Sequence, residues 1–166
     1  MEFKDKKVIA RLKEARWYEG RNIQDELSFN YEDSPNFVKE FHYKYANLII
    51  KRVDDPRMKG EAELHIFSDV EQEFLKGEQD YPYYQGIIGK RLYPLGVYLP
   101  DAYNVCCDAD GRVYKIGEYC FSVGKNLYEG IENILLMNTL QSLQLDEDTG
   151  KWWNMEAEYV ELPTLE

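Results

Sequence analysis

The residues of this chain that have the chemistry for acid–base catalysis or metal binding are two histidines, three cysteines and several pairs of carboxylates. His42 and His65 fall on separate predicted elements, so neither has a second histidine within reach for acid–base work. We expect His42 to be a partly exposed residue of a helix. The carboxylate pairs are Asp54/Asp55, Glu71/Glu73 and Asp108/Asp110. In an acidic chain such pairs are common on solvated faces, so they do not identify a catalytic acid and base.

Known catalytic motifs are missing from the sequence. It has no Gly-x-Ser-x-Gly nucleophile elbow, no Gly-x-x-x-x-Gly-Lys-Ser/Thr phosphate loop, and no Cys-x-x-Cys or His-Glu-x-x-His metal motif. These absences predict a protein that is not an enzyme and holds no cofactor. An unrecognised enzyme stays open as an alternative, which a deep polar pocket gathering several of the carboxylates would support.

The cysteines also give little sign of a metal site. There are three, Cys106, Cys107 and Cys120, and the odd number with an adjacent pair favours a reducing compartment over a disulfide framework. Neighbouring side chains of a strand point to opposite faces, so Cys106 and Cys107 are not expected to share a zinc ion. Residues 108–111 are similar to the start of a calcium loop, but Arg112 stands where such a loop needs an acceptor. We therefore predict no metal.

Size and charge bound the class of protein. The chain has 166 residues, 44% of them apolar, which predicts one globular domain over residues 1–166. No window is long and apolar enough to span a bilayer, so we expect a cytoplasmic protein. Residues 1–60 contain 13 lysines and arginines against 11 acidic residues, whereas residues 61–166 contain 7 against 20. Nucleic acid and membrane are therefore unsuitable partners, and a basic protein is the favoured one.

The elements that must position these residues begin with helices. Residues 6–16 have the apolar period of a helix, and Trp17 is expected to pack back on a sheet. A second helix is predicted over Ser34–Tyr45, with Ser34 as its cap and Pro35 at its first position. A final helix is predicted over Asn126–Met137, where Asn126 and Glu129 are spaced as in a capping box. Arg21 is interpreted as a structural hydrogen-bond or ion-pair partner, with a surface contact as the alternative.

The centre of the chain indicates a sheet. Strand patterns cover residues 47–53, 61–67, 86–114 and 118–123, and residues 151–162 alternate enough for another strand or an arm. Pro94 and Gly96 indicate an edge, a bulge or a bend, and residues 110–111 a hairpin turn. We predict an α+β domain with a central, mainly antiparallel sheet of about five or six strands and helices packed on it. One core is expected to contain Trp17, Phe41, Leu92 and Leu135.

Two acidic segments are the candidate partner-binding sites. Residues 69–76 are predicted to form a short helix, and residues 77–84 a loop that combines acidic residues with three tyrosines. The tyrosines either cover the sheet edge or form an exposed recognition loop. Residues 146–150 are predicted to form a second acidic turn. The candidate contact residues are Glu71, Glu73, Glu78, Asp80, Tyr81, Tyr83, Tyr84, Asp146, Glu147 and Asp148.

Several short motifs, taken in order, resemble the SUKH superfamily. They are Arg16–Arg21, residues 89–96 (Gly-Lys-Arg-Leu-Tyr-Pro-Leu-Gly) and residues 108–114 (Asp-Ala-Asp-Gly-Arg-Val-Tyr), followed by Val123-Gly124 at the start of a helix. The chain is most similar to the third SUKH group, the bacterial immunity proteins of polymorphic toxin systems. The resemblance covers about residues 7–136 and leaves residues 146–166 as an acidic, tryptophan-rich extension.

The resemblance implies a function that the residues alone do not. It implies an immunity protein that binds and neutralises a cognate toxin domain, often a nuclease, in the cytoplasm of the producing bacterium. A general interaction or regulatory domain of the SUKH type, without a toxin partner, is the alternative. The paired Trp152 and Trp153 of the extension are too apolar to remain in solvent. They are therefore expected to dock either on their own domain or on a neighbouring chain.

Overall fold

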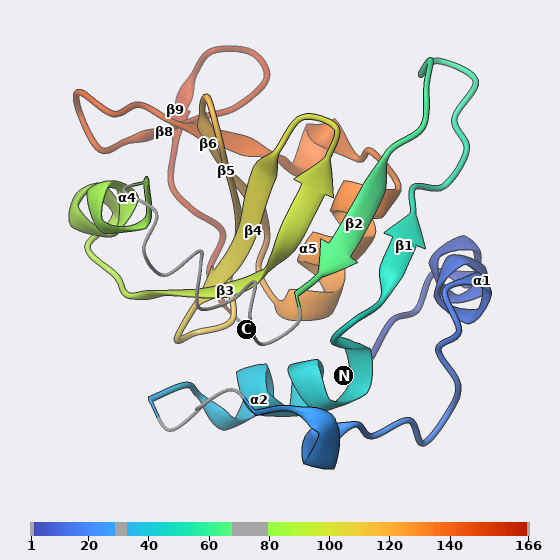
Figure 1. The fold of residues 1–166 in the computed structure, drawn as a ribbon. Coiled ribbons are helices and arrows are strands. Elements are labelled where there is room, and N and C mark those ends of the chain that lie inside the picture. The colour runs from blue at the N-terminus through green and yellow to red at the C-terminus, as the bar shows by residue number, and fades with distance from the viewer. Residues whose placement is uncertain (1, 29–32, 68–79, 166) are drawn as a thin grey trace.

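All strands of the described chain belong to one antiparallel sheet, and their order in the sheet follows their order in the sequence (Figure 1). The computed structural model describes residues 2–28, 33–67 and 80–165. The nine strands within these residues are β1 (Ile49–Lys51), β2 (Glu63–Ile66), β3 (Leu92–Leu99), β4 (Tyr103–Asp108), β5 (Val113–Ile116), β6 (Cys120–Gly124), β7 (Leu143–Leu145), β8 (Trp152–Trp153) and β9 (Tyr159–Val160). The α+β class and the antiparallel sheet are confirmed, whereas the predicted strand number of five or six is too low.

Helices cover the two faces of this sheet unequally (Figure 1). They are α1 (Lys6–Glu14), α2 (Asn36–Tyr45), α4 (Asp80–Ile88) and α5 (Leu127–Leu135), with 3₁₀ turns η1 (Gln24–Glu26) and η2 (Thr139–Gln141). Helices α1, α2 and α5 contribute their apolar residues to one core, while α4 contributes to the other. Residues 69–76, predicted as a short helix, lie outside the described residues.

The sheet therefore separates two cores. The larger contains Phe41 and Leu135, with Trp17 partly buried against it, stacked on Tyr45 at 6.1 Å between ring centroids. Leu92 was predicted to share this core, but it belongs to the second core on the opposite face. Adjacent cysteines divide in the same way, as predicted: Cys107 lies in the first core and Cys106 in the second. The alternation of side chains along a strand explains both results.

Strand β3 has the bulge that its sequence indicated. The register against β4 shifts between Pro94 and Gly96. The strand is nevertheless central, because it pairs with β2 on its other side, so the edge alternative is wrong. A Cβ atom on Gly96 would lie 2.3 Å from the backbone oxygen of His65, so this position requires glycine for the close approach of β2.

Two predicted helix starts had different outcomes. Asn126 caps α5 by accepting a hydrogen bond from the Glu129 amide at 3.0 Å, as predicted. The Glu129 carboxylate accepts from the amide of Lys125, one residue before the cap, rather than from that of Asn126 as in a complete capping box. Helix α2 instead begins at Asn36, with Pro35 rather than Ser34 at the cap position and no side-chain cap bond. The proposed cap at Ser34 is therefore wrong, although the helix itself is confirmed.

Candidate partner-binding surface

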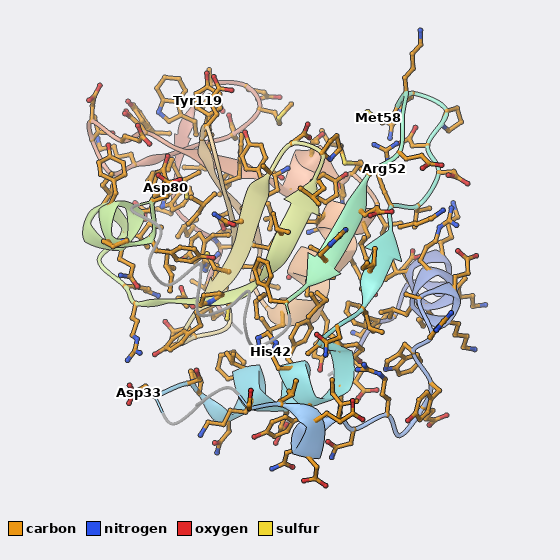
Figure 2. The ribbon with its side chains drawn as sticks, viewed as in Figure 1. Asp33, His42, Arg52, Met58, Asp80 and Tyr119 are labelled. Atoms are coloured by element: carbon orange, nitrogen blue, oxygen red, sulfur yellow. The ribbon has the colours of Figure 1, made fainter. Side chains whose placement is uncertain are left out.

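Most of the candidate contact residues lie in two places on the structure. Glu71, Glu73 and Glu78 fall outside the described residues. The others are at the start of α4, which contains Asp80, Tyr81, Tyr83 and Tyr84, and in the turn between β7 and β8, which contains Asp146, Glu147 and Asp148. Figure 2 shows Asp80 toward the same end of the molecule as Tyr119, away from α1.

The tyrosine segment is a helix where residues 80–84 were predicted to be a loop. Tyr81 and Tyr84 are each only 4% exposed and pack in the second core. Tyr83 points outward and is 53% exposed, beside the exposed Asp80. The spacing explains the difference, since positions 81, 84 and 88 fall on one helical face. Of the three tyrosines, Tyr83 has the exposure that a partner contact needs.

The turn after β7 is held by its first carboxylate. Asp146 accepts hydrogen bonds from the Thr149 hydroxyl at 2.7 Å and the Tyr159 hydroxyl at 2.6 Å, and also from the Asp148 amide at 3.1 Å. Hydrogen bonds from Tyr159 and Thr149 hold the pKa of the Asp146 carboxyl below its ordinary value. Glu147 and Asp148 are exposed beside it. The turn thus presents fixed negative charge to solvent.

One pair of side chains connects helix α4 to this turn. Burial, followed by the neighbouring carboxylate of Glu147, raises the pKa of the Tyr84 hydroxyl above its ordinary value. Residues 84 and 147 are therefore neighbours in space despite their separation in sequence. The start of α4 and the turn after β7 therefore lie next to each other.

A shallow groove of about 230 Å³ opens on this surface. The carboxylates of Asp146, Glu147 and Asp148 line it together with the rings of Tyr119 and Trp153. Tyr119 is 48% exposed and Trp153 is 38% exposed. Neither ring was among the candidate contact residues. The sequence did offer one signal for Trp153, the expectation that the tryptophan pair must dock on a protein surface. In the structure, Trp152 is buried in the second core against Tyr114, whereas Trp153 is left at the surface.

The residues of the SUKH-like motifs serve the fold. Asp108 is fully buried and accepts hydrogen bonds from the Tyr114 hydroxyl at 2.8 Å and from the amides of Asp110 and Arg112. Lys90 reaches the carboxylates of Asp108 and Asp110 at 3.4 and 2.7 Å. The motif at residues 89–96 therefore holds the hairpin turn of the motif at residues 108–114.

Arg21 of the upstream motif is likewise structural, as interpreted from the sequence. Its guanidinium donates to the backbone oxygens of Lys44 at 2.6 Å and Ala46 at 2.8 Å. These carbonyls lie at the C-terminal end of α2, where the helix leaves backbone acceptors without an internal donor. Arg21 thus fixes the segment after α1 to the end of α2.

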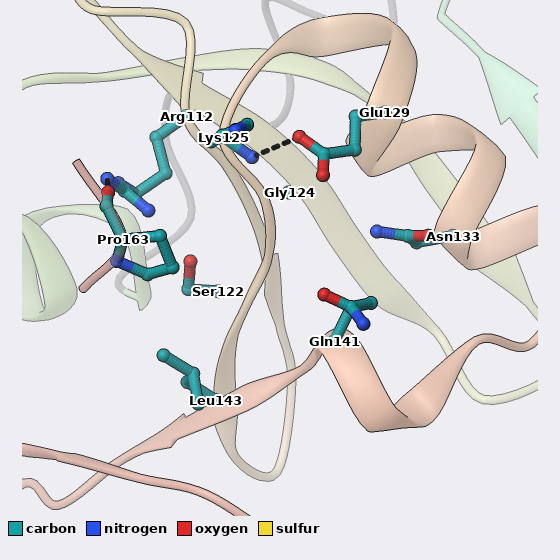
Figure 3. A pocket seen from close by; sticks show the side chains of 9 residues that line it. All are labelled: Arg112, Ser122, Gly124, Lys125, Glu129, Asn133, Gln141, Leu143 and Pro163. Atoms are coloured by element: carbon teal, nitrogen blue, oxygen red, sulfur yellow. Dashed lines mark hydrogen bonds between the residues drawn. The ribbon is translucent and has the colours of Figure 1, made fainter. Parts of the chain in front are cut away.

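A second pocket, of about 120 Å³, lies between the start of α5 and the C-terminal segment (Figure 3). Arg112 is only 5% exposed there, and its guanidinium donates to the backbone oxygen of Pro163. The Asn133 amide donates to the Val123 oxygen at 2.8 Å. The first bond fixes the start of β5 to the C-terminal segment, and the second fixes α5 to β6. Arg112 thereby ties the extension to the sheet, so the extension docks on its own domain.

His42 is buried rather than partly exposed, contrary to expectation. Its Nε2 lies 3.2 Å from the Pro94 oxygen, and burial lowers the pKa of the imidazole to about 4. Figure 2 shows His42 on α2, next to the sheet. Within the described residues, no group of three or more His, Cys, Asp or Glu side chains is placed to hold a metal ion. No helix of that part of the chain is long and apolar enough to cross a membrane.

Comparison with known proteins places these features in a family. The family model described as SUKH-3 immunity protein matches residues 4–137. The match includes every SUKH-like motif discussed above and ends just after α5, before β7. No curated protein and no solved structure matches the chain significantly.

Proposed function

Because this chain belongs to the SUKH-3 immunity protein family, we propose that it binds and neutralises a cognate toxin domain in the cytoplasm of the bacterium that produces both. The observation that carries this proposal is the family match over residues 4–137, most of the chain. The protein acts by occupying a surface of the toxin and has no catalytic role of its own. Its polar motif residues support this, because the buried Asp108 and Arg112 and the partly buried Arg21 are engaged in holding the fold.

The acidic surface formed by α4 and the β7–β8 turn is the proposed contact site. Asp80, Tyr83, Glu147 and Asp148 are exposed on it, within residues 61–166, where 7 basic and 20 acidic residues give a balance of −13. A basic toxin domain is drawn to such a surface, and the association is faster at low salt. A nuclease is the fitting class of toxin, since its substrate-binding cleft must be basic and an acidic protein can occlude it.

Co-expression tests the proposal directly. The toxin domain encoded beside this gene is produced from an inducible promoter, with and without this protein, and survival is compared with that of cells carrying an unrelated acidic protein. We expect survival only with this protein and a complex of the two chains on size-exclusion chromatography. Cells that die equally in all cases, together with no complex, would contradict an immunity function and favour a general interaction domain.

A further inference from the structure

One face of strands β7–β9 is left partly open. Cross-strand pairing places Phe121, Gln144, Trp153 and Tyr159 in one row, because each is directly opposite the next. Helix α5 packs against β5 and β6, at the start of this row. Farther along, Trp153 and Tyr159 are 38% and 51% exposed. The opposite face of the same strands is closed, since Leu145 and Trp152 lie in the second core.

Trp153 lines two depressions. One is the acidic groove, which Tyr119 and residues 146–148 also line. The other is a depression of about 230 Å³ with mainly apolar walls, which Phe121 and Met155 also line, and Met155 is 64% exposed. Each has the size of one or two side chains rather than of a free ligand, whose sites are usually larger.

The negative charge along the acidic groove favours a cationic side chain of a partner. Asp146, Glu147 and Asp148 line the groove together with Trp153 and Tyr119. Aromatic faces attract cations, and the carboxylates add a direct Coulomb attraction. The chain already makes one such contact beside the groove: the Lys151 ammonium lies 5.1 Å from the centroid of the Tyr159 ring. A lysine or arginine of a partner therefore fits the groove, and an apolar neighbour of that residue fits the other depression.

We propose that the open face of β7–β9 is the anchor site for the toxin domain, with Trp153 at its centre and a cationic side chain of the partner in the acidic groove. This inference rests on the proposed immunity function for the identity of the partner. It adds that Trp153 and the three carboxylates of the site lie after the end of the family match at residue 137, whereas Tyr119 and Phe121 come from the matched part. Exposed tryptophans within a polar rim are the usual dominant contributors to interface affinity.

The protein alone provides the first test. A peptide of alternating arginine and leucine residues is titrated into the ¹⁵N-labelled protein, with a glutamate–leucine peptide as control. We expect a saturable shift of the Trp153 indole N–H resonance, identified by its loss in Trp153→Phe, while the buried Trp152 indole responds far less. About 1 M NaCl, where the Debye length is about 3 Å, should abolish the shift. An unshifted Trp153 resonance, or an equal response to the glutamate peptide, overturns the inference.

The second test uses the toxin domain in a catalytically inactive form. Trp153→Ala should weaken its binding by about 30-fold or more, a typical hot-spot loss. Tyr18→Ala is the matched control, since Tyr18 is an exposed aromatic at 61% in the segment after α1, and its binding should match wild type. Met155→Asp tests the same face should Trp153→Ala not fold. Unchanged binding by Trp153→Ala or Met155→Asp overturns this site but leaves the immunity function intact. If the wild-type protein binds no neighbouring toxin, the proposed immunity function is contradicted. The peptide titration then tests on its own whether the open face of β7–β9 is a binding site.

Discussion

The part of the chain that identifies the family and the part best shaped for a partner are different. Within residues 4–137, the motif residues Arg21, Asp108 and Arg112 make hydrogen bonds within the protein that stabilise the fold. After residue 137, three short strands extend the sheet and leave Trp153 and Tyr159 exposed beside three carboxylates. A common fold can thus be kept by one set of residues while another set meets the partner.

The two parts are nevertheless joined structurally. Strand β7 pairs with β6, so the extension continues the hydrogen bonding of the matched sheet. Arg112, from a SUKH-like motif, donates to Pro163 near the end of the extension. Trp152 completes the second core against Tyr114. The open face is therefore presented on a fixed support, which lowers the entropic cost of binding compared with a disordered tail.

The largest expected effect comes from the matched part. Asp108→Ala leaves the Tyr114 hydroxyl and two backbone amides without their buried acceptor. We expect the free energy of unfolding to fall by about 4 kcal/mol, measured by urea denaturation. Asp110→Ala is the control, because Asp110 is exposed, and it should cost less than about 1 kcal/mol. Equal losses for the two variants would show that Asp108 is not the centre of the clamp.

The two adjacent tryptophans of the extension are expected to differ in role: Trp152 stabilises the fold, whereas Trp153 is available to contact a partner. Trp152 is 8% exposed and packs on Tyr114, so Trp152→Ala should lower the unfolding free energy by about 3 kcal/mol. Trp153→Ala should lower it by less than about 1 kcal/mol, because that ring is more exposed and faces the groove. Thermal and urea melts of both variants measure this difference. A larger loss for Trp153→Ala would mean that its ring supports the fold instead of being available for a partner.

The sequence predicted local features better than long-range ones. The Asn126 cap and the opposite faces of Cys106 and Cys107 depend on residues within a few positions, and both were predicted. The burial of His42 depends on Pro94, 52 positions away, and no local pattern reports it. Strand β7 has three residues, too few to show a period of two.

For the candidate site, as for the fold, local features were predictable from the sequence and long-range contacts were not. The acidic turn at residues 146–148 follows from composition, and the structure connects it with α4 through Tyr84 and Glu147. The groove, however, combines Tyr119 from the β5–β6 hairpin with Trp153 from β8. Their meeting depends on the pairing of β6 with β7 and of β7 with β8, which side-chain patterns in such short strands do not specify.

A pH effect on stability is expected from His42 in the matched part. His42 has a pKa lowered to about 4 by burial, against about 6.5 in an unfolded chain. Between these values the unfolded state binds the extra proton, so stability is complete above about pH 6.5 and falls as the pH is lowered toward 4. The loss amounts to about 3 kcal/mol at pH 4.

His42→Gln isolates this effect because glutamine does not titrate and its amide can donate to the Pro94 oxygen. Urea melts between pH 7 and pH 4 should give a smaller decline for the variant than for wild type. Parallel declines would assign the acid sensitivity to carboxylates instead.

The smallest expected effect concerns the rate at which the two chains meet. Glu147→Lys with Asp148→Lys reverses two exposed charges at the groove, and Glu19→Lys with Asp25→Lys reverses two exposed charges in the segment between α1 and α2. Both double variants change the net charge by the same amount, so a difference between them reports position alone.

We expect about a tenfold slower association with the toxin domain for the groove variant at low salt, and a smaller decrease for the control. The difference should shrink as salt is raised above about 0.15 M, where the Debye length falls below about 8 Å. Stopped-flow mixing measures both rates across the salt series. Identical rates for the two variants would assign the steering to the overall charge of the protein, and the extension would then contribute contact but not attraction.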